Sequence, residues 1–280
     1  MIEDLPGPID LLRAWGRPAR KRFGQNFLTD VGVLDRIVRV AGVGEGDRVL
    51  EIGPGPGGLT TRLIAAGADV VAIEADPDLA AHLPTVFPDA APLRVLAGDA
   101  LGPVLDEGLE DPPRAVVANL PYNVATEILF RLVQRDAPPP RMALMFQREV
   151  ATRIASRGAE RHFGLLAVGT QIRYRVDLAM SLKPGAFTPP PKVHSAVVRF
   201  ELRDEPLCPP HIEQVVRRVA KMAFGARRKM LRRSLTAMGI DPIPLLEAAD
   251  IAPTARPEAL TLEDFVRLGE IVHEREHAAG

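Results

Sequence analysis

A glycine-rich segment, residues 51–63, has the composition of a loop that binds a nucleotide. Gly53, Gly55 and Gly58 fit the GxGxxG pattern of dinucleotide-binding folds, whereas the same loop read from Glu51 fits ExGxGxG. Glycines at these positions allow a tight turn between a strand and a helix, where backbone N–H groups approach a ligand closely. The loop therefore predicts a nucleotide-like ligand but does not distinguish among such ligands.

Two carboxylates end the apolar runs that follow this loop. Glu74 ends the run VVAIE, and Asp99 ends the run LRVLAGD. Because the carboxyl ends of parallel strands meet at the ligand crevice, we expect Glu74 to accept the ribose hydroxyls and Asp99 to touch an adenine amino group. These positions suit NAD, FAD and S-adenosylmethionine equally. The alternative is that both carboxylates only cap the helices that follow them.

The tetrapeptide Asn119–Leu120–Pro121–Tyr122 ends the fourth apolar run and favours one chemistry. An adenine N6 amine is a poor nucleophile, because its lone pair is delocalised into the ring. If the Asn119 side-chain oxygen and the Leu120 carbonyl accept its two N–H groups, the lone pair turns toward a methyl donor, and Tyr122 can stack on the base. Methyl transfer fits this group better than hydride transfer, although the tetrapeptide could also be an ordinary exit from a strand.

The elements that must position these residues alternate between short apolar runs and segments with helical spacing. Apolar runs that continue without alternation are typical of strands buried on both faces, so they predict a doubly wound, mostly parallel sheet with helices on each side. A linker, residues 204–210, separates this domain from helical patterns, of which one begins at Thr261 and Asp264 with a capping-box spacing. The strands are expected at residues 49–53, 70–74, 93–99, 115–121, 142–147 and 195–202.

The composition is that of a soluble globular protein: 280 residues, a net charge of −1 and 46% hydrophobic residues. No apolar run approaches the ~18 residues that cross a bilayer, and the acidic start is unlike a secretory signal, so we expect a cytoplasmic protein without a membrane partner. Cys208 is the single cysteine, which excludes an intrachain disulfide. His273 and His277 match HExxH, but no third ligand follows them, so we expect a solvated helix end and no metal site.

Two segments carry an excess of positive charge in this nearly neutral chain. Residues 13–22 contain no acidic residue, and residues 211–235 contain only Glu213. Clustered positive charge is typical of polyanion binding, because each neutralised phosphate releases counterions, although solvated helix faces give the same pattern. We therefore predict contacts to RNA phosphates from Arg20, Lys21, Arg22, Arg227, Arg228, Lys229 and Arg232.

Taken together, several motifs resemble those of the ribosomal RNA adenine N6,N6-dimethyltransferases. These motifs are KRFGQNFL (21–28), LEIGPGPGGLT (50–60), NLPYNVAT (119–126), FQREVATR (146–153), FTPPPKVHSAVVRF (187–200) and FGARRKMLRRSL (224–235). The resemblance is closest to the bacterial enzymes that act on small-subunit rRNA. It implies a Rossmann-like class I S-adenosylmethionine-dependent methyltransferase fold with a small all-α C-terminal domain.

The resemblance also implies roles for individual residues. The cofactor S-adenosylmethionine would contact Asn26, Leu28, Gly53, Glu74, Asp99 and Asn119. The target amine would be framed by Asn119, Leu120, Tyr122 and Phe187, the last as a second aromatic surface against the base. The implied domains are a basic arm (1–22), the methyltransferase domain (23–203) and a helical RNA-binding domain (204–280).

The implied reaction transfers methyl groups to N6 of two adjacent adenines near the 3′ end of 16S rRNA, by a monomer acting on an assembling 30S particle. Three alternatives stay open at this point. The chain could methylate large-subunit rRNA, as the macrolide-resistance enzymes do, or could be chiefly a ribosome-assembly factor that binds RNA. An NAD-linked oxidoreductase is a more distant alternative, which the identity of the bound cofactor would decide.

Overall fold

The computed structural model describes residues 5–20, 23–226 and 229–278. The chain forms two compact units. Unit 1 comprises Met1–Ala151 and Asp177–Leu202, and unit 2 comprises Thr152–Val176 and Arg203–Gly280. These units divide the chain differently from the boundaries expected from the sequence, because residues 152–176 belong to unit 2 with the later helices. The RNA-binding role of the helical domain stays a prediction.

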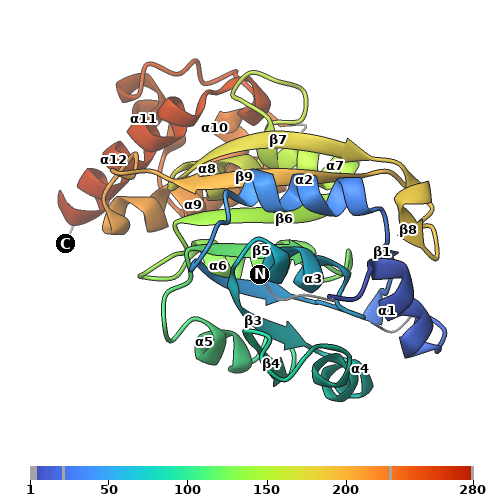
Figure 1. Ribbon diagram of the computed structural model, residues 1–280. Helices are drawn as coiled ribbons and strands as arrows, with labels where there is room; N and C mark the ends of the chain where they lie inside the picture. The colour runs from blue at the N-terminus through green and yellow to red at the C-terminus, as the bar shows by residue number, and fades with distance from the viewer. Residues whose placement is uncertain (1–4, 21–22, 227–228, 279–280) are drawn as a thin grey trace. The chain divides into compact units, whose positions relative to one another are not determined.

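A seven-stranded sheet is the centre of the fold, with strand order β4-β3-β2-β5-β6-β9-β7 (Figure 1). Strands β2 to β6 pair in parallel, and β9 pairs antiparallel to β6, with Gln147 opposite Ser195. The strands are β2 (Arg48–Ile52), β3 (Asp69–Glu74), β4 (Leu93–Ala97), β5 (Ala115–Asn119), β6 (Arg141–Gln147), β7 (Tyr174–Leu182) and β9 (Ser195–Leu202). The expected fold class, including 195–202 as a further strand, is confirmed.

Helices cover both faces of the sheet in unit 1, because successive strand residues point to opposite sides. Val49 and Val70 belong to the apolar cluster that α1, α2 and α3 cover, whereas Leu50 and Ile73 face α5 at Gly108. A Cβ at Gly108 would lie 2.9 Å from Ile73 Cδ1 and 3.0 Å from Leu50 Cδ1, so α5 packs closely on this face of the sheet. The helices that begin in unit 1 are α1 (Pro8–Trp15), α2 (Val31–Ala41), α3 (Gly58–Ala65), α4 (Pro77–His82), α5 (Val104–Gly108), α6 (Ala125–Val133) and α7 (Arg148–Ala155).

Two features of the strands were not expected from the sequence. The edge strand β7 exposes most of its side chains, Leu178 among them, so it lacks the continuous apolar run that marks the central strands. A separate two-stranded ladder joins β1 (Phe27–Leu28) to β8 (Phe187–Thr188), with Leu28 opposite Phe187. Strands this short carry no periodic signal, so only tertiary contacts reveal them.

Unit 2 has its own apolar core, built around Phe163 and Phe265. Helices α9 and α12 approach closely where Gly269 meets Val216, because a Cβ at Gly269 would lie 2.4 Å from Val216 Cγ2. The expected capping box is confirmed: Asp264 N donates to Thr261 Oγ1 at 3.1 Å, and the Asp264 carboxylate accepts from Thr261 N at 2.8 Å. The helices are α8 (Leu165–Gln171), α9 (Pro210–Gly225), α10 (Leu231–Ser234), α11 (Pro242–Ala248) and α12 (Leu262–Ala278).

No helix in the described ranges is both long and apolar enough to cross a lipid bilayer.

Candidate active site

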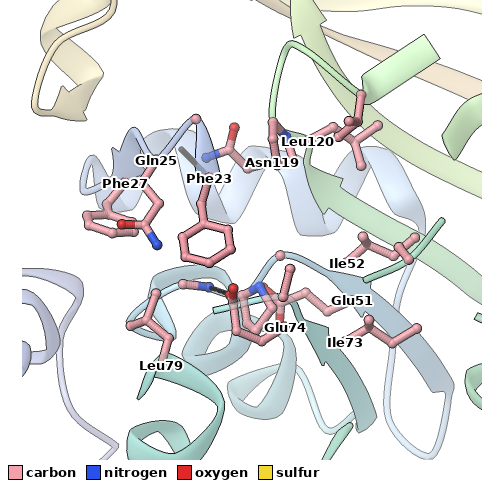
Figure 2. Close-up of a pocket in the computed structure, with 18 of the residues that line it drawn as sticks. Phe23, Gln25, Phe27, Glu51, Ile52, Ile73, Glu74, Leu79, Asn119 and Leu120 are labelled. Atoms are coloured by element: carbon pink, nitrogen blue, oxygen red, sulfur yellow. Dashed lines mark hydrogen bonds between the residues drawn. The ribbon is translucent and has the colours of Figure 1, made fainter. Parts of the chain in front are cut away.

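A cavity of about 340 Å³ opens in unit 1 at the carboxyl ends of the parallel strands. Figure 2 shows its wall, with Phe23 and Gln25 from the N-terminal segment across from Glu74, and Asn119 near Phe23. Most of the lining comes from five segments that are distant in the chain, namely residues 23–28, 51–56 with 58–59, 73–75, 98–100 and 119–124, and Leu79 and Ile128 complete it. The fold thus brings the glycine loop, the two acidic strand ends and the NLPY tetrapeptide to one place.

The glycine loop between β2 and α3 adopts a backbone that other residues rarely take. Gly53, Gly55 and Gly57 have φ values of 72°, 58° and 101°, in the left-handed region. A Cβ at Gly57 would lie 2.8 Å from Leu83 Cδ1, and one at Gly55 would lie 3.0 Å from Phe27 Cδ1. The loop therefore turns tightly and leaves the start of α3 open toward the cavity, where N–H groups favour an acceptor.

Glu74 lies at the end of β3 and is almost fully buried, with 6% of its surface exposed. Its Oε2 accepts from Gly55 N at 3.0 Å, and its Oε1 accepts from Asp76 N at 2.8 Å. Burial raises the pKa of Glu74, and these backbone hydrogen bonds oppose that rise. Glu74 is thus held rigidly at the cavity wall, as ribose recognition requires.

Glu51 is a second buried carboxyl group in the same wall, 1% exposed, and sequence reasoning assigned it no role of its own. Thr60 Oγ1 donates to Glu51 Oε2 at 2.7 Å. Burial raises the pKa of Glu51 to about 8, and the charge of Glu74 contributes to the rise. The ExGxGxG pattern was the available signal, since Glu51 is its first residue.

Asp99 lies just beyond β4 at the edge of the cavity and is exposed. Its Oδ1 accepts from Leu101 N at 2.9 Å and so caps the local turn, whereas the helix that follows, α5, has Pro103 and not Asp99 as its N-cap. Its second oxygen remains to accept from a ligand. The contact of Asp99 with an adenine amine stays a prediction.

The NLPY residues line the cavity directly after β5. Asn119 Nδ2 donates to the backbone oxygen of Asn26 at 3.0 Å, so its Oδ1 is the atom that can accept from a ligand. Tyr122 is half-buried, and its hydroxyl lies 2.5 Å from Ser195 Oγ at the start of β9. Burial raises the pKa of Tyr122, so the phenol is a neutral hydrogen-bonding group. Leu120 is buried and contributes to the same wall.

The N-terminal segment supplies more of the site than the sequence indicated. Asn26 and Leu28 line the cavity as expected, but Phe23, Gln25 and Phe27 line it as well. The signal available was the motif KRFGQNFL, in which these three residues alternate with the expected ones. Together with Gly24, they make this segment a continuous part of the cavity wall from residue 23 to residue 28.

Phe187 lies in the apolar core and not at the cavity. Its ring is 3% exposed and belongs to the apolar core with Leu28, its partner in the β1–β8 ladder. It is not among the described residues that line the cavity. A hydrophobic side chain next to a proline run packs into the core here, so its proposed stacking on the base would require a different side-chain position and stays a prediction.

The predicted RNA contacts fall into three groups. Arg20 pairs with Asp76 at 2.8 Å and also with Asp78. Lys229 is exposed and Arg232 is partly exposed, both in unit 2. The remaining predicted contacts lie outside the described residues: Lys21, Arg22, Arg227 and Arg228.

Three histidine rings lie close together in unit 2. The His273 ring lies 4.0 Å from that of His277 and 5.0 Å from that of His211. His277 Nδ1 is within hydrogen-bonding distance, 2.9 Å, of the His273 backbone oxygen. Within residues 5–20, 23–226 and 229–278, no three His, Cys, Asp or Glu side chains converge as a metal site requires.

The family named ribosomal RNA adenine dimethylase matches residues 16–274. The chain belongs to this family. Across its full length it is 42% identical to a protein of Xanthobacter autotrophicus named ribosomal RNA small subunit methyltransferase A, 98% of which is covered. A protein of the same name from Jannaschia is 45% identical, with 98% of this chain and 96% of the relative covered.

Solved structures agree with the fold. A dimethyladenosine transferase from Plasmodium falciparum superposes with a TM-score of 0.75 at 22% identity, over 89% of this chain and 98% of the other. The 23S rRNA methyltransferase ErmE superposes with a TM-score of 0.68 at 25% identity, over 89% of this chain and 100% of the other. The chain therefore has the Rossmann-like fold of S-adenosylmethionine-dependent methyltransferases, as the sequence predicted.

The residues of the cavity fit S-adenosylmethionine, the cofactor of this enzyme family. The glycine loop, where a Cβ at Gly55 would lie 3.0 Å from Phe27 Cδ1 across the cavity lining, leaves room beside backbone N–H groups for the methionine part. Glu74 at the end of β3 and Asp99 just beyond β4 both line this cavity, and their contacts with the ribose hydroxyls and the adenine amine stay predictions. The apolar side chains of Phe27, Ile73 and Leu79 supply flat contacts for an adenine ring.

Proposed function

We propose that this enzyme dimethylates N6 of two adjacent adenines near the 3′ end of 16S rRNA in an assembling 30S particle. The observation that carries the proposal is the position of Asn119, Leu120 and Tyr122 on the cavity wall that also contains the glycine loop and Glu74. The full-length relatives named small subunit methyltransferase A support the choice of RNA.

Cofactor binding would rest on residues whose positions are already set. Bound S-adenosylmethionine supplies an electrophilic methyl group on a positively charged sulfur. Glu74, held by Gly55 N and Asp76 N, would accept the ribose hydroxyls, and Asp99 would accept from the adenine amine. The apolar side chains among the lining residues, Phe23, Phe27 and Ile73, would displace water around a bound cofactor and so strengthen the electrostatic contacts made there.

The NLPY residues would orient the target amine. Asn119 Oδ1 and the Leu120 carbonyl would accept the two N–H groups of N6 and turn its lone pair toward the methyl group. The hydroxyl of Tyr122 is held by Ser195, so the Tyr122 ring would be in a fixed position to stack on the target adenine after it has flipped out of the rRNA. No strong general base is required, because the methylated amine is acidic enough to release its proton to water.

Selection of the RNA would depend on unit 2. Lys229 and Arg232 are the described members of its predicted basic contacts. Phosphate contacts of this kind position a nucleic acid without reading its sequence. The choice of two particular adenines would therefore depend on which bases of the particle can reach the cavity.

Methylation mapping tests the proposal directly. The enzyme is incubated with methyl-labelled S-adenosylmethionine and, separately, with unmethylated small subunits and with large subunits, and the labelled bases are located. We expect label on two adjacent adenines of the small subunit alone. Label on large-subunit rRNA would support the macrolide-resistance alternative, and tight binding without label would support an assembly factor.

The variant Asn119→Ala tests the proposed orienting role of this residue. We expect it to lower single-turnover transfer by about 100-fold or more, since it removes an acceptor aimed at the reacting amine, while RNA binding is retained. An equal loss in transfer and in cofactor affinity would contradict the orienting role of Asn119.

A further inference from the structure

The N-terminal strap, defined here as residues 16–20 and 23–28, forms one wall of the cavity, yet its outer side is tied to α4. Residues 23–28 line the cavity, and Phe27 packs with Trp15 and Leu79 in a small apolar cluster. Such a wall requires contacts that hold it in place. Without them the segment would be disordered in the free protein, and ordering it on each binding event would cost conformational entropy.

The tether is built around Asp76, whose side chain is fully buried. Arg20 Nη1 donates to Asp76 Oδ1 at 2.8 Å, and Gln25 Nε2 donates to Asp76 Oδ2 at 3.0 Å. Gln25 Oε1 in turn accepts from Arg20 N at 2.7 Å. Both oxygens of a buried carboxylate are thus satisfied by two residues of the strap, which is the condition under which a buried charge is stable.

Asp76 also connects this tether to the cofactor site. Its backbone N–H donates to Glu74 Oε1 at 2.8 Å, and Glu74 Oε2 accepts from Gly55 N at 3.0 Å. The contacts therefore run without a break from Arg20 through Asp76 to the carboxylate at the end of β3. Loss of the Arg20 contact would leave the buried Asp76 carboxylate with hydrogen bonds from Gln25 Nε2 and from Asp78 N, at 3.0 and 3.2 Å, but without the cation that pairs with it.

The opposite edge of the strap is tied to the NLPY loop. Asn119 Nδ2 donates to Asn26 O at 3.0 Å, and Gly24, with φ of 63°, approaches the loop closely enough that a Cβ would lie 3.2 Å from Asn123 Oδ1. The strap thus spans from the acidic end of β3 to the residues that frame the target amine.

We propose that Arg20 and Gln25 are positioning residues. Through their hydrogen bonds to Asp76, they hold the strap in place against bound S-adenosylmethionine. The inference rests on the proposed function of the cavity. It assigns Arg20 to the cofactor site, where the sequence alone predicted an RNA phosphate contact. Arg13, in the same basic segment, pairs with Asp10 at 3.2 Å on an exposed face of α1, outside the strap.

Arg20→Ala provides the test, with Arg13→Ala as the matched control. We expect Arg20→Ala to weaken binding of S-adenosylmethionine by about tenfold, comparable to the loss of one charge-assisted hydrogen bond, in calorimetric titration of the full-length protein without RNA. Arg20→Lys should recover part of the affinity, because it restores a cation without the two-pronged contact. Gln25→Ala should weaken binding in the same direction, and Arg13→Ala should leave it unchanged.

The salt dependence of RNA binding separates this role from a phosphate contact. If Arg20 holds the strap, the slope of log affinity against log salt for unmethylated rRNA stays as in the wild type. An unchanged cofactor affinity in Arg20→Ala, or a slope reduced by about one charge, would overturn the proposal. Failure of the wild type to methylate rRNA would instead contradict the proposed function. The two outcomes are distinguishable, because the cofactor titrations need no RNA.

A general loss of folding is distinguished by thermal unfolding. Arg20→Ala removes the cation beside the fully buried Asp76 carboxylate, so we expect its midpoint to fall below that of Arg13→Ala. Asp76→Asn with Arg20→Ala separates this effect from the tether: the double variant should regain part of the midpoint and bind S-adenosylmethionine no more weakly than Arg20→Ala alone, since the two residues act through one contact. Additive losses would overturn the tether.

Discussion

The surroundings of Glu51 determine whether this buried carboxyl group is protonated. It lies in the wall of the cavity with Thr60 as its hydrogen-bond partner and Glu74 as a neighbouring carboxylate. Desolvation is the largest cause of its raised pKa, so the side chain is largely protonated at neutral pH in the ligand-free protein. A cationic ligand would favour the ionised form instead, because it supplies the missing opposite charge.

The protonation of Glu51 predicts an unusual pH dependence of stability. Because the native state holds this proton more tightly than the unfolded chain, the contribution to wild-type stability falls as pH rises from about 4.5 to about 8. Glu51→Gln removes that term, so its thermal midpoint relative to the wild type should increase between pH 5 and about 8. Glu45→Gln, at an exposed glutamate, is the control and should show no such trend. A constant difference across the pH range would contradict the assignment.

The contact between Tyr122 and Ser195 places a second prediction at the scale of single residues. Ser195→Ala and Tyr122→Phe each remove the same hydrogen bond and leave the ring in place. We expect each to reduce kcat/KM for rRNA by about 3- to 10-fold, because a base stacks less well on a poorly held ring, with cofactor affinity unchanged. The double variant should lose no more than either single one. Additive losses, or an equal loss of cofactor affinity, would show that the pair acts otherwise.

At the scale of elements, the strand-to-helix turn between β2 and α3 depends on backbone geometry that side chains disturb. Gly57 combines φ of 101° with a close approach to Leu83, so an added methyl group meets two obstacles at once. The turn also sets the direction of the first N–H groups of α3. Disturbing it should therefore affect both stability and cofactor binding.

Gly57→Ala should destabilise the protein by about 1–3 kcal/mol, from backbone strain and overpacking together. Gly46→Ala is a matched control, because Gly46 has φ of 76° but nothing within 4 Å of the added Cβ, so it isolates the strain. Urea unfolding of the two variants measures the difference, and equal losses would mean that the contact with Leu83 costs nothing.

At the scale of the whole molecule, the two compact units carry different parts of the proposed function. Unit 1 contains the cavity and every residue expected to bind the cofactor, whereas unit 2 contains the exposed Lys229 and the partly exposed Arg232. Substitutions in unit 2 should therefore change RNA binding while leaving the cofactor site as it is.

The variant Lys229→Ala with Arg232→Ala should reduce the slope of log RNA affinity against log salt by about two charges, because each neutralised phosphate releases a counterion. Binding of S-adenosylmethionine should be unchanged. Arg218→Ala is the control, since Arg218 is paired with Glu276 at 2.6 Å within the same unit. A slope equal to that of the wild type would show that these residues face away from the RNA.

Local patterns made much of the cavity predictable. The GxGxG turn, Glu74, Asp99 and Asn119 all follow apolar runs, and parallel strands necessarily gather their carboxyl ends at one edge. The capping box at Thr261 was predictable for the same reason, because its two partners are only three residues apart. In each case the contact, or the edge that brings the residues together, is a property of the local chain.

Contacts between distant segments were not predictable in this way. Phe187 packs into the core because β8 pairs with β1 across more than half of the chain, and residues 152–176 join unit 2 through contacts with helices that follow residue 202. Arg20 carries the same charge whether it meets a phosphate or Asp76, so composition could not distinguish the two. The sequence by itself determined the family, the parallel strands of the sheet and the edge at which the cavity opens, because these depend on short-range patterns. Only the tertiary structure decided which partner each charged or aromatic side chain meets, because that depends on which distant segments the fold places next to it.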